Sequence, residues 1–184
     1  MVVYIGLLRA VNVGGRNMIK MEVLREICGA LKFRGAQTYV QSGNVVFASD
    51  ERDAAVVAKK LQAAIEKKVG FRPEVMVRTA GEIREVVARN PFAKRRGLEP
   101  KKLLVTFLSG EPDAEGLKAA RGMKTDPEEM RIEGREAFVY YPNGFGKSKL
   151  VWPKVERMLK VAGTARNWNS VVKLLEMAEA MEKT

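Results

Sequence analysis

The chain has 184 residues, a formal net charge of +11, one cysteine and no histidine. The absence of histidine excludes Ser-His-Asp and Cys-His catalysis, as well as metal sites that use imidazole ligands. The single cysteine, Cys28, excludes an intramolecular disulfide, which is typical of a reducing compartment. The composition is that of a globular protein, long enough for one domain or two small ones.

The positive charge is distributed over the whole chain. Residues 1–92 contain 15 basic and 9 acidic side chains, and residues 93–184 contain 18 and 13. Such an excess favours polyanionic partners or phosphorylated ligands. A highly charged, solvated surface would give the same composition, so both interpretations stay open.

Targeting and metal-binding signals are absent from the sequence. The first residues lack a basic signal-peptide region, and no apolar run reaches the length of about 18 residues needed to span a membrane. We therefore expect a cytoplasmic protein without a membrane partner. Cys28 shares a helical spacing with Leu24 and Ile27, which indicates a core position. Only an all-oxygen site could hold a metal, and no carboxylate cluster has calcium-loop spacing, so we predict no metal and no cofactor.

Residues 1–80 alternate between short apolar runs and amphipathic segments in the order βαββαβ. Strands are expected at Val3–Leu8, Thr38–Gln41, Asn44–Ala48 and Glu74–Arg78, and helices at Met21–Phe33 and Asp53–Val69. Ser42-Gly43 supplies a hairpin turn, and either Asp50 or Asp53 could cap the second helix. This order is that of a ferredoxin-like, or split βαβ, unit.

The second half partly repeats this order. Residues 81–101 are predicted to form a helix and a linker marked by Pro91, Gly97 and Pro100. Further strands are expected at Lys102–Leu108, Glu129–Ile132 and Ala137–Tyr141, and helices at Asp113–Arg121, Leu150–Val161 and Asn167–Lys183. We therefore expect an α+β fold of two ferredoxin-like units in tandem, 1–80 and 102–184. The second unit is degenerate, βαββ followed by two helices, and the pattern leaves open whether the two form one compact domain.

Two loops rich in glycine, asparagine and arginine are expected to meet at one edge of the first sheet. In a sheet of order 4-1-3-2, the end of the first strand lies beside the start of the third. Exposed backbone N–H groups beside arginines would bind an anion there, although the same residue types are also typical of tight turns. The candidate ligand-binding residues at this edge are Arg9, Asn12, Gly14, Gly15, Arg16, Gln41, Ser42, Gly43 and Asn44.

A second glycine-rich loop, Gly144–Ser148, resembles the end of a phosphate-binding P-loop. Tyr141 stands where the full pattern needs glycine, which argues against a nucleoside triphosphate site. A weaker hypothesis is that Lys147 and the start of the next helix hold a phosphate. The alternative is that Ser148 only caps that helix.

The last helix opens with Thr164–Ser170, in which Trp168 belongs to the apolar stripe. Arg166 and Asn169 have no such structural duty and are candidate contacts to an anion or a partner. The central strands of both units are apolar on both faces, which indicates that both faces are buried. An open RNA-binding sheet would instead present aromatic and polar residues on a free face.

Four ordered motifs resemble the bacterial DUF1697 family, a domain of unknown function. They are Tyr4–Gly15, Thr38–Phe47, Pro142–Leu150 and Thr164–Asn169. Ala10 and Lys147 depart from the glycine and arginine expected at those positions. The resemblance implies a bacterial α+β protein of two units, and it supplies no catalytic residue because the family has no established activity.

Three functional hypotheses follow from the sequence. The first is a non-catalytic module that binds an anionic partner, nucleic acid or a phosphorylated small molecule, at the glycine- and arginine-rich edge. The second is an enzyme acting on a phosphorylated metabolite with arginine clamps, for which no clear general base is visible. The third is a protein-interaction scaffold whose charge serves only solubility. The ligand and the oligomeric state do not follow from the sequence.

Overall fold

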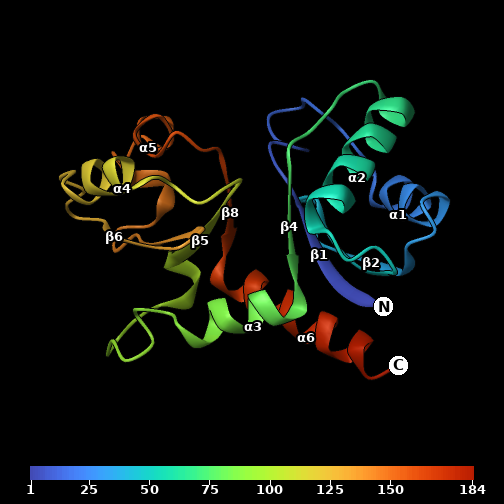
Figure 1. Ribbon diagram of the computed structural model, residues 1–184. Helices are drawn as coiled ribbons and strands as arrows, with labels where there is room; N and C mark the ends of the chain where they lie inside the picture. The colour runs from blue at the N-terminus through green and yellow to red at the C-terminus, as the bar shows by residue number, and fades with distance from the viewer. The chain divides into compact units, whose positions relative to one another are not determined.

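The computed structural model describes residues 1–184 and divides them into two compact units. The first unit contains residues 1–85 and 172–184, and the second contains residues 86–171. The fold is mixed α+β, with two four-stranded antiparallel sheets and six α-helices (Figure 1). None of the helices combines the length and the apolar character needed to cross a membrane.

The first unit has the predicted βαββαβ order. Its elements are β1 (Val2–Leu8), α1 (Met21–Ala30), β2 (Arg34–Tyr39), β3 (Asn44–Ser49), α2 (Ala54–Val69) and β4 (Val75–Thr79). The strands pair in the order β2-β3-β1-β4, as expected, with Ile5 opposite Val46 on one side and Arg78 on the other. The end of β1 therefore lies beside the start of β3.

Helices α1 and α2 cover one face of this sheet (Figure 1). Leu24 and Leu61 pack with Tyr4 and Phe47 in a continuous apolar core. Asp53 caps α2 by accepting hydrogen bonds from the backbone N–H groups of residues 55 and 56, which confirms one of the two predicted caps. Cys28 is buried in α1 as predicted, and burial raises the pKa of its thiol to about 12.

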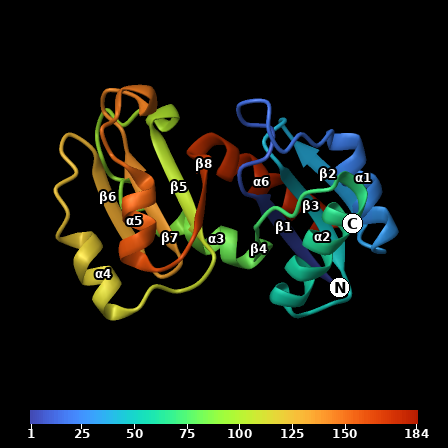
Figure 2. The same ribbon diagram turned by 90° about the horizontal axis from the view of Figure 1, so that it is seen from above.

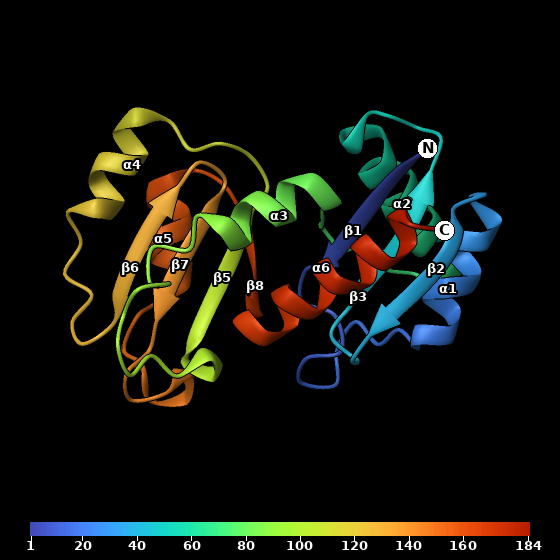
Figure 3. The same cartoon turned by 90° about the horizontal axis from the view of Figure 1, so that it is seen from below.

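The C-terminal part of the chain returns to the first unit. Helix α6 (Trp168–Glu182) crosses towards β2 in Figure 3, where the methyl group of Met181 would lie 3.5 Å from a Cβ at Gly35. Helix α3 (Ala80–Ala88) contributes Arg84, which forms ion pairs of 2.8 Å with both Glu179 and Glu182. These contacts attach residues 172–184 to the first 85 residues.

The second unit contains a complete second copy of the order. Its elements are η1 (Pro100–Lys102), β5 (Leu103–Leu108), α4 (Ala114–Arg121), β6 (Glu129–Glu133), β7 (Glu136–Tyr140), η2 (Phe145–Lys147), α5 (Trp152–Leu159) and β8 (Gly163–Asn167). The sheet order is β6-β7-β5-β8, and α4 packs beside α5 (Figure 2). As predicted, β1 and β5 are buried along almost their whole length.

The prediction of a degenerate second unit is wrong at one element, β8. Residues 163–167 were expected to precede and open the last helix, but they form a strand antiparallel to β5, with Arg166 opposite Val105. The strand has no apolar alternation from which it could be recognised. Its pairing depends on β5, which lies far away in the sequence, and on Gly163, where an added Cβ would meet Thr106 at 2.6 Å.

Candidate functional site

Residues 9–20, called here the edge loop, connect β1 to α1 and contact the β2–β3 turn. The Leu8 N–H donates to the Gly43 carbonyl at 2.9 Å, and the Asn12 side-chain amide donates to the Gln41 carbonyl at 2.8 Å. At the same edge, the Arg9 N–H donates to the Glu74 carbonyl ahead of β4 at 2.9 Å. The predicted convergence of these loops is therefore confirmed.

Asn12 braces the edge loop from inside. Its side-chain amide also donates to the Ile19 carbonyl at 3.0 Å, and its side-chain oxygen accepts from the Ile19 N–H at 2.8 Å. The Asn12 N–H donates to the Asn17 carbonyl at 3.2 Å, and Ile19 is buried. One asparagine thus closes the loop on itself and attaches it to the neighbouring turn, a structural role that accounts for its presence.

The tip of the edge loop is a tight two-residue turn. Gly14 and Gly15 both have positive φ (60° and 71°), and the Arg16 N–H closes the turn by donating to the Val13 carbonyl at 3.1 Å. The N–H groups of the two glycines have no acceptor within the protein. A positive φ also occurs at Val40 (49°), where a β-branched residue makes it a strained conformation.

The edge loop carries basic side chains and no acidic one. Arg16 and Lys20 are exposed and form no ion pair or side-chain hydrogen bond. Arg9 differs, because its guanidinium is paired with the Glu74 carboxylate at 3.1 Å. The uncompensated charge of this edge is therefore concentrated on Arg16 and Lys20.

Two of the predicted ligand-binding residues serve the turn instead. Asn44 is fully buried, and its side-chain amide donates to the Tyr39 carbonyl at 3.1 Å and to the Ser42 hydroxyl at 2.9 Å. Gly43 is buried, and a Cβ at this position would lie 2.5 Å from Val11. Both residues shape the edge, while Gln41 and Ser42 stay exposed on it.

The same edge also exposes apolar side chains. Val13, Met18 and Val40 are 67%, 61% and 52% exposed, and they are half of the six large hydrophobic residues exposed in the chain. They adjoin Asn12, Ile19 and Gln41 in the sequence, the three residues that the hydrogen bonds of the Asn12 side chain connect. The surface of the edge is thus both cationic and apolar.

The predicted residues of the second unit do not form one cluster. Lys147 is exposed in η2, but Ser148 does not cap the next helix, because its hydroxyl accepts from the Leu150 N–H at 3.0 Å. Helix α5 begins later, at Trp152, without a side-chain cap. Asn169 is exposed at the start of α6, and its backbone N–H donates to the Asn167 side chain at 3.0 Å.

Arg166 is buried in β8, which corrects the interpretation that it has no structural duty. Its guanidinium donates to the Thr164 hydroxyl at 2.7 Å and to the Ala165 carbonyl at 2.9 Å, and burial lowers its pKa to about 10. Sequence reasoning missed its counterpart, Arg78, which is buried at the equivalent register of β4. The sequence signal for Arg78 was a basic residue inside β4, a strand that is otherwise mostly apolar.

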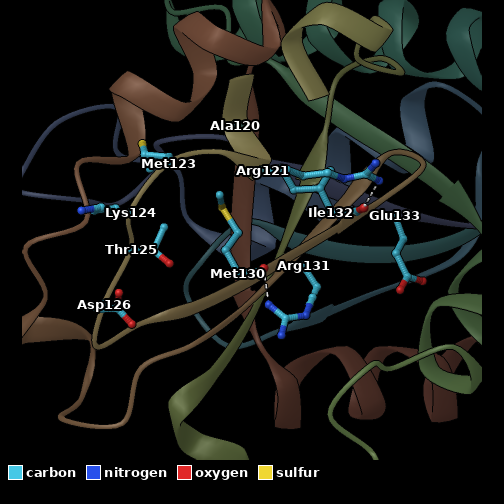
Figure 4. Close-up of a pocket in the computed structure, with 10 residues that line it drawn as sticks. All are labelled: Ala120, Arg121, Met123, Lys124, Thr125, Asp126, Met130, Arg131, Ile132 and Glu133. Carbon is cyan, nitrogen blue, oxygen red and sulfur yellow. Dashed lines mark hydrogen bonds between the residues drawn. The ribbon is translucent and has the colours of Figure 1, made fainter. Parts of the chain in front are cut away.

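Two adjoining hollows lie in the second unit at the end of α4. The larger, about 580 Å³, lies between residues 120–126 and β6, and Figure 4 shows Lys124 and Thr125 on the side away from Glu133. The Arg121 guanidinium donates to the Ile132 carbonyl at its wall, at 3.1 Å. The smaller, about 170 Å³, lies between residues 123–128 and residues 149–154. Sequence reasoning did not identify either one, since the concave shape depends on how the chain folds back between α4 and β6 and, for the smaller hollow, on a second segment at residues 149–154.

The acidic side chains are not arranged as a metal site. No group of three or more histidine, cysteine, aspartate or glutamate side chains gathers at a distance suited to a shared ion. The edge loop offers arginine, lysine and backbone N–H groups, which bind anions, whereas the hollows combine basic side chains with the carboxylates of Asp126, Glu128 and Glu133.

Comparisons with known proteins identify the relatives of the chain. Residues 1–138 match the profile of the family described as "Protein of unknown function (DUF1697)". The chain is similar to the solved structure of conserved bacterial protein SP0830 from Streptococcus pneumoniae, with 21% identity and a TM-score of 0.77 over 96% of this chain and 98% of that chain. No curated protein matches the sequence. At this identity, the structural likeness shows the fold alone.

Proposed function

The chain belongs to the DUF1697 family of proteins of unknown function, and we propose that it is a non-catalytic module that binds nucleic acid through its edge loop. The observation that carries the proposal is the pair of exposed, unpaired cations, Arg16 and Lys20, on a braced loop without acidic residues. Phosphate groups are the anions that such cations and the free N–H groups at Gly14 and Gly15 would contact.

The shape of the edge loop favours a macromolecular ligand. Gly14 and Gly15 form an exposed turn, and nothing lies within 4 Å of a Cβ at either position. A protruding turn of this kind contacts a partner from outside and does not enclose a small molecule. The bracing by Asn12 keeps the loop in one conformation, so little ordering entropy is lost on binding.

We also propose that both units have the ferredoxin-like arrangement, with their functional residues outside the sheets. Support comes from the identical strand order and from the helices packed on each sheet. The same proposal places the end of the first ferredoxin-like unit at residue 80 and the start of the second at residue 102. In this arrangement the strand order that both units share supplies a rigid base, and the loops supply recognition.

The test is fluorescence anisotropy of labelled single-stranded RNA and DNA, first at low salt and then near 200 mM salt. The double variant Arg16→Ala, Lys20→Ala should lower the slope of log affinity against log salt by about 1.4, because two phosphate contacts are lost. The matched control is Lys59→Ala, Lys67→Ala, which removes two exposed charges from α2. Equal effects of the two double variants would show that net charge acts without a site and would reject the proposal.

A protein partner is the second candidate function, and the exposed apolar residues of the same edge favour it. Val13 and Met18 flank Arg16 and together offer an apolar contact area with a cationic rim. A photo-crosslinking residue placed at position 13 should then give protein adducts in cells, and Met18→Ser should remove them. Adducts with nucleic acid alone would reject this candidate.

A further inference from the structure

The smaller hollow of the second unit, called here the lysine hollow, is lined by three lysines and by Glu128. Lys124 comes from the α4–β6 connection, Lys149 from the β7–α5 loop, and Lys154 from the first turn of α5. Glu128 and the exposed Asp126 line the same hollow. The hollow belongs to the second unit, whereas the edge loop belongs to the first.

The charge of the three lysines is not compensated by ion pairs. None of them forms an ion pair or a side-chain hydrogen bond. Several acidic groups of this unit are engaged elsewhere: Glu129 with Arg95, and Asp113 with Lys160. The unit as a whole has 17 basic and 10 acidic residues. Against Asp126 and Glu128, the three lysines leave the lining of the hollow with a net positive charge, which attracts a phosphate.

Glu128 adds an acceptor that a plain anion site would not contain. The residue is 4% exposed, and its carboxylate receives no hydrogen bond and no ion pair from the protein. Its backbone is fixed, because its N–H donates to the Thr125 carbonyl and its own carbonyl accepts from the Thr125 hydroxyl, both at 2.8 Å. The carboxylate oxygens are not among the fully buried polar atoms without a partner, so they are reachable from the hollow, and a ligand hydroxyl group can donate a hydrogen bond to them.

A neighbouring phenol supports this placement. Tyr141 is buried, and burial together with the nearby charge of Glu128 raises its pKa to about 12. Tyr141 therefore stays protonated at neutral pH. The three lysines and Glu128 thus line one hollow as cations and as a hydrogen-bond acceptor.

We propose that the lysine hollow binds a small phosphorylated sugar, with the phosphate on Lys124, Lys149 and Lys154 and a hydroxyl group donating to Glu128. A ligand with both an anionic group and a hydroxyl donor can contact the lysines and Glu128 together, whereas a simple anion or a simple amine contacts only one of them. The volume of about 170 Å³ lies below the roughly 300–1,000 Å³ of pockets for drug-sized ligands, which restricts the ligand to a small metabolite.

The test is isothermal titration calorimetry of the full chain with ribose 5-phosphate and glucose 6-phosphate, and with inorganic phosphate and the unphosphorylated sugars as separate probes. At least one sugar phosphate should bind at least tenfold more tightly than inorganic phosphate or the free sugar. Lys149→Met and Lys154→Met, both at exposed positions, should each weaken sugar phosphate binding about tenfold. Lys118→Met, which removes an exposed lysine of α4 outside the hollow, is the matched control and should change nothing.

Glu128→Gln tests the proposed hydroxyl contact independently of the phosphate contact. This variant should bind the sugar phosphate more weakly. It should bind inorganic phosphate as tightly as the wild type or more tightly, because a negative charge that repels phosphate is removed. Thermal unfolding of each variant checks that it folds. Absence of sugar phosphate binding to the wild type at millimolar concentration, or equal effects of Lys118→Met and Lys149→Met, would overturn the proposal. Arg16→Ala, Lys20→Ala should leave this binding intact, so a failure at the edge loop is distinguishable from a failure here.

Discussion

The first unit has its long loop after its first strand, whereas the second unit has its long loop after its third. Residues 9–20 separate β1 from α1, but only residues 109–113 separate β5 from α4. Conversely, residues 50–53 join β3 to α2, but residues 141–151 join β7 to α5. In a βαββαβ order these connections fall at opposite ends of the sheet.

The backbone hydrogen bonds at the end of β1 match those at the end of β5. Leu8 N–H donates to the Gly43 carbonyl, and Leu108 N–H donates to the Arg135 carbonyl, at 2.9 Å in each case. The next residue in each unit, Arg9 or Ser109, donates to the residue before the last strand. The long loop after β1 and the short connection after β5 thus start from the same strand pairing.

The two units differ in charge at this edge, where β1 and β5 end. In the first unit, the edge loop has free cations and no acidic residue. In the second, Lys160 is paired with Asp113 at 3.0 Å and with Glu115 at 3.3 Å, so the cation is neutralised. Because long exposed loops cost little stability, each unit can carry recognition chemistry at a different end of one shared scaffold.

The largest expected difference between the units lies in the glycines of their hairpin turns. Gly43→Ala should lower the free energy of unfolding by about 3 kcal/mol, since the new Cβ would lie 2.5 Å from Val11 and 2.8 Å from Leu8 in a left-handed conformation. Gly134→Ala should cost only about 1 kcal/mol, because its φ is also positive but its nearest neighbour is at 3.6 Å. Urea unfolding measures both. Equal losses would mean that the edge loop does not pack against its turn.

The two buried arginines should instead behave alike. Each donates to the carbonyl of the preceding residue, Arg78 at 3.1 Å and Arg166 at 2.9 Å. Replacing either with methionine should cost about 2–3 kcal/mol, because hydrogen bonds to a buried charged group are lost. Arg131→Met is the control: it removes the same local bond at an exposed position and should cost less than about 0.5 kcal/mol. A clear difference between Arg78 and Arg166 in chemical unfolding would break the equivalence of β4 and β8.

The smallest effect concerns Asp113, which occupies the edge of the second unit in place of a long loop. The Gly116 N–H and then Lys160 hold the pKa of Asp113 below its usual value, so its stabilising contribution is present above the pKa of the unfolded chain and is lost as the pH falls through the lower folded pKa. Asp113→Ala should therefore destabilise the protein at pH 7, and the difference from wild type should shrink below about pH 4. A difference that stays constant from pH 7 to pH 2.5 in thermal unfolding would contradict this role.

The sequence by itself determined the elements whose pattern is local. The apolar run of β1, the amphipathic stripe of α2 and the cap at Asp53 are each readable within a few residues, because they depend on periodicity and on one hydrogen bond to the next turn. The meeting of the edge loop with the β2–β3 turn also followed from the strand order. What those loops bind did not follow, since the same residues serve turns and ligands alike.

Only the tertiary structure decided the features that depend on distant partners. Strand β8 has no apolar alternation, and its pairing with β5 joins residues about sixty positions apart in the chain. For the same reason Arg166 was assigned no structural role and was taken as a candidate ligand contact, although the strand places it in the interior. The lysine hollow likewise unites Lys124 with Lys149 and Lys154, which no local pattern connects. Burial and proximity are properties of the packed chain, and a sequence pattern records them only where the contacts are local.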